Sequence, residues 1–536
     1  LKTYAEQLDN KKSLIALNLM DEPGSTPDHV KTCPHCIKGF PAYLKQCKLT
    51  PEALGLKNLN EAKPTDDPVA GALFYWSMRY RNHLMTELLR LGTTIAGRFM
   101  PDTRTMVNFA TELIYDGNMV QRGCDWYEVY DSGALTHGWT EDWNNCSKTY
   151  QTVGFQCDTM RSACRTSSVP FGIYNILCRS PWDIQAKGFA AIGHGARVMH
   201  LFNYGPYYTP TTDTNSQRPE IYETIKRLTY ATGAVDKHLQ QAKVTQGDAA
   251  QLLSVTSDIW NCTKDNVFGR ERVYLNLLLR HNNVSIDVLG ENELVNRLND
   301  YRTLFVTDSH LRRELVKPLV DWVKNGGTLY LGAGALQYDE NGRPLGLDEQ
   351  LGLRRSALSL TKLPGRADQE MQKLEKLGEY EGMSLLCGTQ KTADKAMTAK
   401  AACGKGKVLF FGGFPGISYI AGAKSSVPGI YSALDYPEAP RRFIAGIIRQ
   451  AGITPRLTTD NYRVEANLQE GPQADVIVIS NWTGKPQTVE LELHNVPSYR
   501  QVRSVSGKLL HHELNNGKLS LRVTIDAGDY IECIKP

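Results

Sequence analysis

One stretch of the sequence decides the fold: Leu14-Ile-Ala-Leu-Asn-Leu-Met-Asp21-Glu22-Pro23-Gly24. Its apolar residues predict a strand, and Pro23 ends that strand because proline has no N–H to donate to a sheet. The strand therefore places Asp21 and Glu22 at its carboxyl end, where (β/α) barrels hold their catalytic side chains. A carboxylic acid at that place can protonate a departing sugar oxygen if its pKa is raised. An ordinary strand followed by an acidic turn is the alternative interpretation.

Length, composition and charge limit the class of protein. The 536 residues suffice for roughly two to four domains, and a hydrophobic fraction of 41% suffices for sizeable cores. The 61 basic and 57 acidic residues leave a net charge of +4, which gives no electrostatic reason to expect nucleic acid. No apolar run is long enough for a membrane span. Because the chain begins with Leu1, we expect that it was processed or that its start is missing.

The cysteines and one recurring triplet favour an oxidising compartment. There are twelve cysteines, and five of them lie close together from Cys124 to Cys178. Such clustering is more typical of disulfide-bonded, exported proteins than of cytosolic enzymes. The glycosylation acceptor pattern occurs at four positions: Asn145, Asn261, Asn283 and Asn481. We therefore expect a secreted or cell-surface protein, with disulfides and attached glycans.

Residues 1–243 alternate short strands with helices, which is the pattern of parallel βα units in a barrel. Further strands are predicted to begin near Thr105, Trp126, Pro170 and Ala196. Polar and aromatic residues follow these strands, and one end of a parallel barrel gathers such side chains into a sugar-binding cleft. The candidate substrate-binding residues are Asn108, Trp139, Trp143, Asn175, Asn203 and Tyr204. For each of them an ordinary half-buried role is the alternative.

Two further domains are predicted. Residues 247–450 contain near-continuous apolar strands separated by amphipathic helices, which indicates a doubly wound, flavodoxin-like sheet. No glycine-rich turn in it opens a helix in the way a phosphate-binding loop does, so we expect no nucleotide site. Residues 457–536 alternate apolar and polar side chains between turn signals, which predicts a small antiparallel β-sandwich.

This order of domains resembles the family 42 β-galactosidases and their relatives among the glycoside hydrolases. The resemblance rests on Leu19-Met-Asp21-Glu22-Pro-Gly, on Cys33-Pro-His-Cys36 and on Trp322-Val-Lys-Asn-Gly-Gly327. It implies hydrolysis of an oligo- or polysaccharide, with Glu22 as general acid/base and Asp21 orienting or tuning it. It also implies a trimerisation-type second domain, and so a homo-oligomer that could be a trimer. No cofactor is expected.

The resemblance also bears on the cysteine loop, because some relatives hold a structural metal with cysteines there. Cys33, Cys36 and Cys47 are therefore weak candidate ligands for a structural zinc. A disulfide among them is an equally good interpretation.

The first departure from the family concerns the strand count. In these enzymes the strand that carries the acid/base is the fourth of eight, and here it begins near Leu14. The four predicted strands after it would be the fifth to the eighth, so the first three have no room in this chain. Because a half barrel would expose open edges, we expect an N-terminal fragment or a second chain to complete it.

The second departure concerns the other catalytic carboxylate. Retaining glycosidases need it on the seventh strand, but Pro170 to Leu177 contain neither Asp nor Glu. The nearest alternatives are Glu141 and Asp142, which stand between Trp139 and Trp143. We take them as candidate partners of Glu22, and a solvated acidic turn is the alternative.

Two other functions stay open at this point. Adjacent Asp and Glu also occur in hexosaminidases that use the acetamido group of the substrate as nucleophile, a mechanism that needs no second carboxylate on the protein. A barrel without its nucleophile could also be an inactive carbohydrate-binding or assembly protein.

Overall fold

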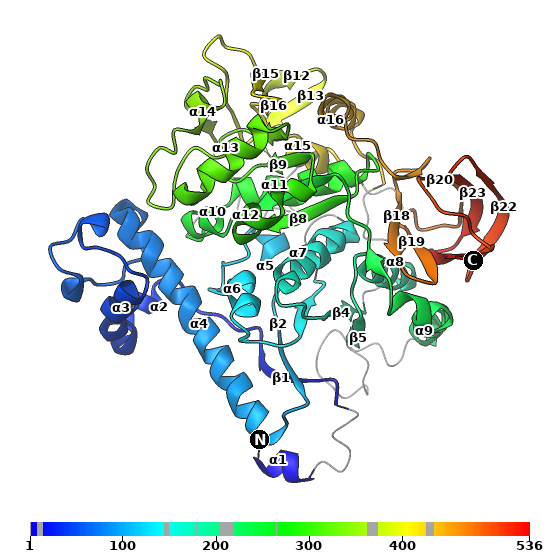
Figure 1. Cartoon of the computed structure of the whole chain (residues 1–536), viewed down its shortest axis with the longest axis horizontal. Coiled ribbons are helices and arrows are strands. Elements are labelled where there is room, and N and C mark those ends of the chain that lie inside the picture. The colour runs from blue at the N-terminus through cyan, green and yellow to red at the C-terminus, as the bar shows by residue number, and fades with distance from the viewer. Residues whose placement is uncertain are drawn as a thin grey trace.

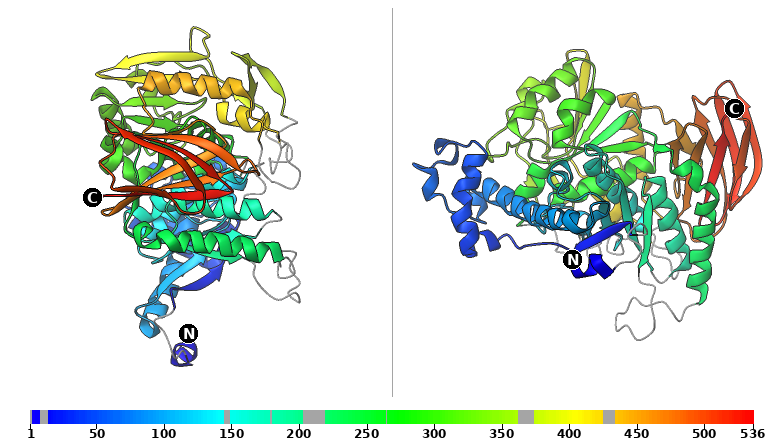
Figure 2. Two further views of the ribbon diagram at one scale, coloured as in Figure 1. Left: turned by 90° about the vertical axis from the view of Figure 1, so that its right-hand side faces the viewer. Right: turned by 60° about the horizontal axis from the view of Figure 1, so that its bottom comes forward.

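The computed structural model describes residues 2–7, 14–143, 149–177, 180–202, 219–263, 265–361, 374–424 and 434–536. A set of parallel strands with their helices, a doubly wound sheet and an antiparallel sandwich follow one another along the chain (Figure 1). The three parts pack against each other, with the sandwich at one side of the molecule (Figure 2). Over these described ranges, every helix is too short or too polar to cross a membrane.

The first part has five parallel strands in chain order. They are β1 (Ala16–Asp21), β2 (Arg104–Asn108), β3 (Gly138–Glu141), β4 (Phe171–Ile176) and β5 (Val198–Phe202). β1 pairs with β2, β3 pairs with β4, and β4 pairs with β5. A parallel bridge from Phe109 to Thr140 joins the two groups. This order agrees with the fourth to eighth strands of a (β/α) barrel.

The two outer strands of this set differ from the inner ones. In the described residues, β1 has only β2 beside it, and β5 has only β4. β3 is wholly buried and β2 and β4 nearly so, whereas β1 and β5 are partly exposed along their length. Ile15 and Met20 are 59% and 37% exposed. The part of the chain that the structure describes therefore forms an open barrel.

Helices surround these strands, and one long helix carries a small lobe away from them (Figure 1). They are α1 (Lys2–Gln7), α2 (His29–Thr32), α3 (Pro34–Gln46), α4 (Ala72–Phe99), α5 (Glu112–Tyr115), α6 (Trp126–Asp131), α7 (Val153–Arg165), α8 (Pro181–Gly193) and α9 (Pro219–Leu239). The predicted helices over 70–91 and 182–192 correspond to α4 and α8.

The strand predicted to begin at Trp126 was wrong, because these residues form helix α6. The side chain of Asp125 caps the helix by accepting from the Glu128 N–H at 3.2 Å. The run of Trp, Tyr and Val favours a strand by propensity, but burial of nearly the whole helix decides the outcome. The sixth strand of the barrel is β3 instead, which ends at Glu141.

The second part is the predicted doubly wound sheet. Its six strands run in the order β15 (Thr398–Cys403), β16 (Gly406–Phe411), β10 (Thr328–Leu331), β9 (Thr303–Val306), β7 (Ala249–Leu253) and β8 (Ile286–Gly290). Only β15 is antiparallel to its neighbour. Gly327 must be glycine, because a Cβ there would meet the Trp322 ring at about 2.5 Å. The Gly-Gly pair therefore ends a helix directly before a buried strand, as predicted.

Helices cover both faces of this sheet, and separate apolar clusters fill the two sides. They are α10 (Val255–Trp260), α11 (Val267–Arg280), α12 (Leu294–Arg297), α13 (Val316–Lys324), α14 (Leu347–Gln350), α15 (Pro415–Ala421) and α16 (Glu438–Ala451). Two small hairpin-like pairs lie beside it, formed by β11 (Ser359–Leu360) with β14 (Gly388–Thr389) and by β12 (Lys376–Tyr380) with β13 (Met383–Leu386).

The third part is the predicted β-sandwich. One sheet has the order β17 (Leu457–Thr459), β20 (Gln487–His494), β23 (Lys518–Ile525) and β22 (Lys508–Asn515). The other has the order β21 (Gln501–Ser504), β24 (Gly528–Ile534), β19 (Ala474–Asn481), β18 (Val464–Glu470) and β6 (Lys243–Val244). β6 comes from the segment that follows the barrel helices, so it joins the sandwich to the first part of the chain.

The barrel strands do not have a core of their own. One apolar cluster contains Val107 and Trp126 from the first part, Phe268 and Phe414 from the second, and Trp482 from the sandwich. The three parts of the chain therefore share buried surface that none of them could cover alone.

The cysteines and the glycosylation triplets do not take the form expected from the sequence. The ten cysteines in the described ranges form no disulfide with one another, while Cys146 and Cys178 lie outside those ranges. Asn261 and Asn481 are buried, and their amides donate to backbone carbonyls. Both side chains are thus out of reach of a modifying enzyme in the folded protein. Asn145 also lies outside the described residues.

Candidate functional site

Three parallel strands bring polar side chains together at their carboxyl ends. Asn108, the last residue of β2, donates from Nδ2 to Asp21 Oδ1 at 2.6 Å and to Glu141 Oε1 at 2.5 Å. Its own Oδ1 accepts from Asn18 Nδ2 at 2.9 Å. Asn108 is 1% exposed, so its amide is a rigid bridge between the acid of β1 and the acid of β3.

Glu22 is held beside this bridge by Arg122. Its backbone φ angle is +39°, a left-handed conformation that residues other than glycine adopt only at a cost in conformational energy. The Arg122 guanidinium donates from Nη1 to Glu22 Oε2 at 2.9 Å and also binds Glu112. The Glu22 side chain is 34% exposed, so solvent or a ligand can reach it.

Glu141 is the buried member of the group, with 5% exposure. Its pKa is raised to about 8, chiefly by burial and also by the neighbouring Glu22 and Asp21, while the hydrogen bond from Asn108 lowers it. Glu141 is therefore protonated at neutral pH, and its Oε2 has no hydrogen-bond partner in the residues that the structure describes.

Asp142 does not join the group, because successive side chains of a strand point to opposite faces of the sheet. It accepts from the Ile176 N–H at 2.8 Å and pairs with Lys187 Nζ at 3.0 Å. Both side chains of this ion pair are 1% exposed. Burial raises the pKa of Asp142 to about 6, and the positive charge of Lys187 opposes that shift. Asp142 therefore anchors β3 to α8.

The aromatic candidates lie on the same side of the sheet as Glu141. The Trp139 ring packs edge-on against Tyr174, with 5.2 Å between ring centroids, and Tyr174 packs against His200 at 4.9 Å. Trp139 is only 4% exposed, whereas His200 is exposed. Trp143 is half-buried and its ring meets Phe202.

The remaining candidates are placed differently. Asn175 is buried on the other face of β4, where its Nδ2 donates to the backbone carbonyl of Ile184 at 3.0 Å. It therefore supports α8 and does not face Glu141. Asn203 and Tyr204 lie outside the described residues.

Sequence reasoning missed two residues of this group, Asn18 and Arg122. Asn18 is the single polar residue inside the apolar stretch from Leu14 to Met20, and that interruption is a signal that could have found it. Nothing near Arg122 in the sequence marks it, since its contact with Glu22 spans 100 residues.

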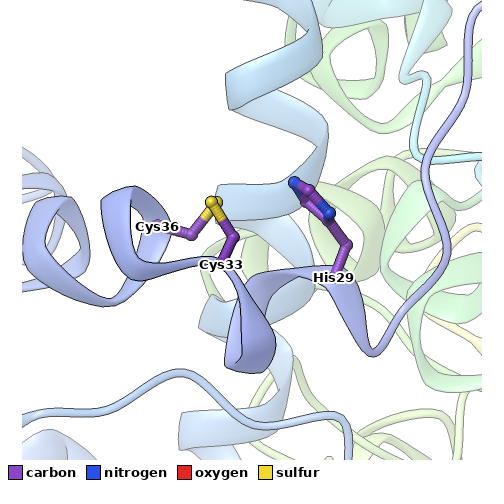
Figure 3. A group of neighbouring side chains, drawn as sticks. All are labelled: His29, Cys33 and Cys36. Carbon is purple, nitrogen blue, oxygen red and sulfur yellow. The ribbon is translucent and has the colours of Figure 1, made fainter.

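A second cluster of possible ligands lies at the start of the lobe carried by α4. The side-chain donors of His29, Cys33 and Cys36 all lie within 4.8 Å of one another. Figure 3 shows the two thiols pointing toward each other and the His29 ring beside them. Hydrogen bonds from Cys36 lower the pKa of the Cys33 thiol, whereas burial raises the pKa of Cys36 to about 11. Two sulfurs and one imidazole are a donor set that suits tetrahedral zinc.

Cys47, the third predicted ligand, lies elsewhere. It follows the last residue of α3, and the rise of about 1.5 Å per residue puts it about 16 Å from Cys36 along the helix. Its thiol forms a hydrogen bond with Tyr43. His29 takes the third place in the cluster, one helical turn before Cys33.

Comparisons with known proteins show which solved structures have a similar fold. No protein-family model matches the sequence, and no curated protein matches it. A catalytic mutant of a GH42 β-galactosidase from G. stearothermophilus superposes with a TM-score of 0.71 at 15% identity, over 100% of this chain and 80% of that chain. The β-galactosidase from Bacillus circulans sp. alkalophilus gives 0.70 at 13% identity, over 99% and 81%.

A third solved structure is an apo GH42 exo-carrageenase from Bacteroides ovatus, with a TM-score of 0.56 at 11% identity over 93% of this chain and 62% of that chain. At identities this low, the likeness concerns the fold alone. The chain therefore has a fold related to that of the GH42 β-galactosidases, on a glycosidase-like scaffold.

Proposed function

We propose that this chain, with its GH42-like fold, hydrolyses glycosidic bonds in an oligo- or polysaccharide and that Glu22 is its general acid/base. One observation carries the proposal: Glu141, buried and with a raised pKa, stands beside the accessible carboxyl group of Glu22 at the carboxyl ends of parallel barrel strands. Carboxyl groups at that end of such a barrel are placed to act on a bound ligand, and a raised pKa keeps a carboxylic acid protonated at neutral pH.

Glu22 and Glu141 have different roles in the proposed reaction, because one is accessible to solvent and the other is buried. Glu141 is buried and keeps the proton in the resting site, because its pKa lies near 8. Glu22 is accessible, so it is the group that touches the substrate and transfers the proton to the oxygen of the leaving sugar. The proton that Glu22 gives to the leaving oxygen comes from Glu141, which becomes a carboxylate still bonded to Asn108 as the glycosidic bond breaks. A water molecule then bonds to the anomeric carbon, and the proton that this water loses returns to the pair of carboxylates. Asp21 keeps the Asn108 amide oriented during this exchange.

The substitution Glu141→Gln tests this division of roles. It keeps the shape of the side chain but removes the exchangeable proton, so we expect kcat to fall by about 10²-fold at neutral pH. In the unchanged protein, kcat should fall as the pH rises through about 8, because Glu141 loses its proton there. In the Glu141→Gln variant that alkaline decline should disappear. Hydrolysis of a panel of aryl glycosides, measured from pH 5 to 10 (about the range that brackets the pKa), gives both results.

Asp142→Asn is the matched comparison, since Asp142 is the next residue and faces α8 instead of the site. It should lower stability but leave the pH dependence of kcat unchanged. If no glycoside is hydrolysed while the folded protein still binds oligosaccharides, the alternative of an inactive carbohydrate-binding protein replaces this proposal.

We also propose that His29, Cys33 and Cys36 hold a structural zinc ion, with a fourth ligand from solvent or from another part of the chain. The proposal is supported by the 4.8 Å grouping of three good zinc ligands and by the hydrogen bonds from Cys36 that lower the pKa of the Cys33 thiol from its usual value. Bound there, the metal would join α2 to α3 and so fix the path of the chain between Glu22 and the lobe. It would take no part in the reaction.

Metal analysis of the purified protein tests the zinc site. We expect about one zinc per chain, no zinc in the Cys33→Ser, Cys36→Ser double variant, and a lower melting temperature for that variant. Cys47→Ser should keep the metal, because Cys47 lies at the other end of α3. A metal-free protein in which mass spectrometry finds Cys33 and Cys36 joined by a disulfide would contradict the assignment.

Finally, we propose that the outer strands β1 and β5 have further neighbours in the working particle. Exposed strand edges invite pairing, and Ile15 and Met20 are apolar side chains left in solvent at the edge of β1. A homo-oligomer, or a further polypeptide segment that completes the barrel, would cover them. The native mass and subunit composition of the purified particle decide between these arrangements.

A further inference from the structure

A cavity of about 1010 Å³ lies at the opposite end of the barrel strands from Glu22. It reaches Phe171 and Arg197, which stand at the amino ends of β4 and β5, and Ile286, which opens β8. β6 and Asn467 of the sandwich complete its walls. We propose that this cavity binds a polyhydroxylated oxyanion, such as a sugar carrying a phosphate, sulfate or carboxylate group.

The cavity is rich in cationic side chains, and most of them are already paired with carboxylates. Six lysine or arginine side chains line it: Arg161, Arg165, Arg197, Lys243, Arg280 and Arg297. Arg161 pairs with Asp158 at 2.7 Å and with Asp287 at 3.0 Å, and Arg165 pairs with Asp287 at 2.9 Å. Arg280 binds Asp158 as well, and Arg297 binds Asp300 at 3.1 Å. These groups neutralise one another and need no ligand.

Arg197 is different, because its hydrogen-bond partners are all neutral. Its Nη2 donates to the Ala242 carbonyl at 2.7 Å and to Gln469 Oε1 at 3.0 Å. Its Nη1 is buried and has no hydrogen-bond partner in the described residues. Burial and the positive charge of Arg161 both lower the pKa of Arg197. A half-buried guanidinium that has an unused donor and no carboxylate partner is a place where an anion gains energy.

Lys243 stands next to Ala242, whose carbonyl accepts from Arg197, and it lines the same cavity. Its partner across β6 and β18 is Glu470, whose carboxylate forms its ion pair with Arg456 at 2.7 Å. Arg197 and Lys243 therefore both line the cavity, and two cations can bind an oxyanion at two points.

The other charged groups of the cavity do not cancel this excess. His194 lies between Asp158 and Glu465, and their charges raise its pKa against the effect of burial. Asp131 is the one lining carboxylate without a cation in the described residues, and it accepts from Asn292 at 3.3 Å. The lining thus has more positive than negative groups.

The volume of the cavity and its neutral side chains indicate what the uncharged part of the ligand is. The cavity is far larger than an inorganic ion needs, and lies at the upper end of the volumes of roughly 300–1,000 Å³ that small-molecule sites have. Amide side chains of Gln240, Gln246 and Asn296 are available to bind hydroxyl groups. We therefore infer an organic anion with several hydroxyls, with its charged group at Arg197 and Lys243.

Calorimetric titration of the whole protein tests this inference. The probes are glucose 6-phosphate, glucose 6-sulfate and glucuronate, with glucose as the uncharged comparison, all at one ionic strength. We expect at least one of the three anions to bind and glucose not to bind. The anion that binds most tightly identifies the charged group. Arg197→Gln and Lys243→Gln should each weaken its binding by about tenfold. Arg227→Gln, which removes a cation from the exposed face of α9, should leave the affinity unchanged.

Three results would overturn the inference: no binding of any of the three anions, equal binding of glucose, or unchanged affinity in both cavity variants. Lys243→Gln keeps the test valid if Arg197→Gln fails to fold, because the Lys243 side chain is exposed. The titration needs no enzymatic activity, so its outcome is independent of the proposed function of Glu22.

Discussion

Replacing Glu22 by Gln is expected to lower kcat for glycoside hydrolysis by about 10³-fold while the protein stays folded. The amide keeps the size of the side chain and one acceptor oxygen for Arg122, but it cannot pass a proton to the leaving sugar oxygen. The loss should exceed that of Glu141→Gln, because Glu22 is the exposed member of the pair and the one that touches the substrate. Steady-state kinetics on an aryl glycoside that the unchanged protein hydrolyses give the measurement.

Two controls separate chemistry from folding. Glu112→Gln changes the other carboxylate that Arg122 binds, and it should cost much less activity since Arg122 keeps its bond to Glu22. The circular dichroism spectrum and melting temperature of Glu22→Gln should match those of the unchanged protein, because the substituted side chain is partly in solvent. Undiminished turnover in the Glu22→Gln variant would remove Glu22 from the mechanism.

Arg272→Met is expected to have the largest effect on stability, a loss of about 3–5 kcal/mol in the free energy of unfolding. Arg272 is wholly buried and binds Asp258 at 3.0 Å and Asp308. Methionine fills much of the space but leaves two buried carboxylates without their cation. Burial raises the pKa of Asp308 to about 7 even with Arg272 present. Denaturant unfolding followed by fluorescence measures the loss.

The exposed Arg302 provides the comparison. Its side chain is 77% exposed and its nearest carboxylate, that of Asp248, is 3.9 Å away, so Arg302→Met should change stability by less than about 1 kcal/mol. A similar small effect for Arg272→Met would mean that the two buried aspartates are neutral or reach other partners.

The parts of the fold that follow from local pattern could be predicted from the sequence. The apolar run before Asp21, the Gly-Gly pair after Trp322 and the alternating residues of the sandwich each determine their own element. The count of five barrel strands was right, although the sixth barrel strand was misplaced by one element. Its residues around Trp126 have strand propensity, and only their burial among other parts of the chain makes them a helix.

The site could be predicted in outline and not in detail. Strand ends gave Asp21, Glu22 and Asn108, because parallel strands bring their carboxyl ends to one edge. Glu141 was predicted only as a carboxylate in the segment after the sixth strand, and the structure shows that it ends β3. Glu141 could not be separated from Asp142 until the strand boundary was known, since a shift of one residue exchanges the two faces. Arg122 and His29 depend on contacts that only the folded chain creates.

The shared core has a consequence for synthesis on the ribosome. Val107 and Trp126 emerge several hundred residues before Trp482, yet all three belong to one buried cluster. The nascent barrel strands must therefore wait, with apolar faces uncovered, until nearly the whole polypeptide has been made. Such a chain should depend on chaperones that hold unfinished proteins, and fragments that stop before Trp482 should aggregate when expressed.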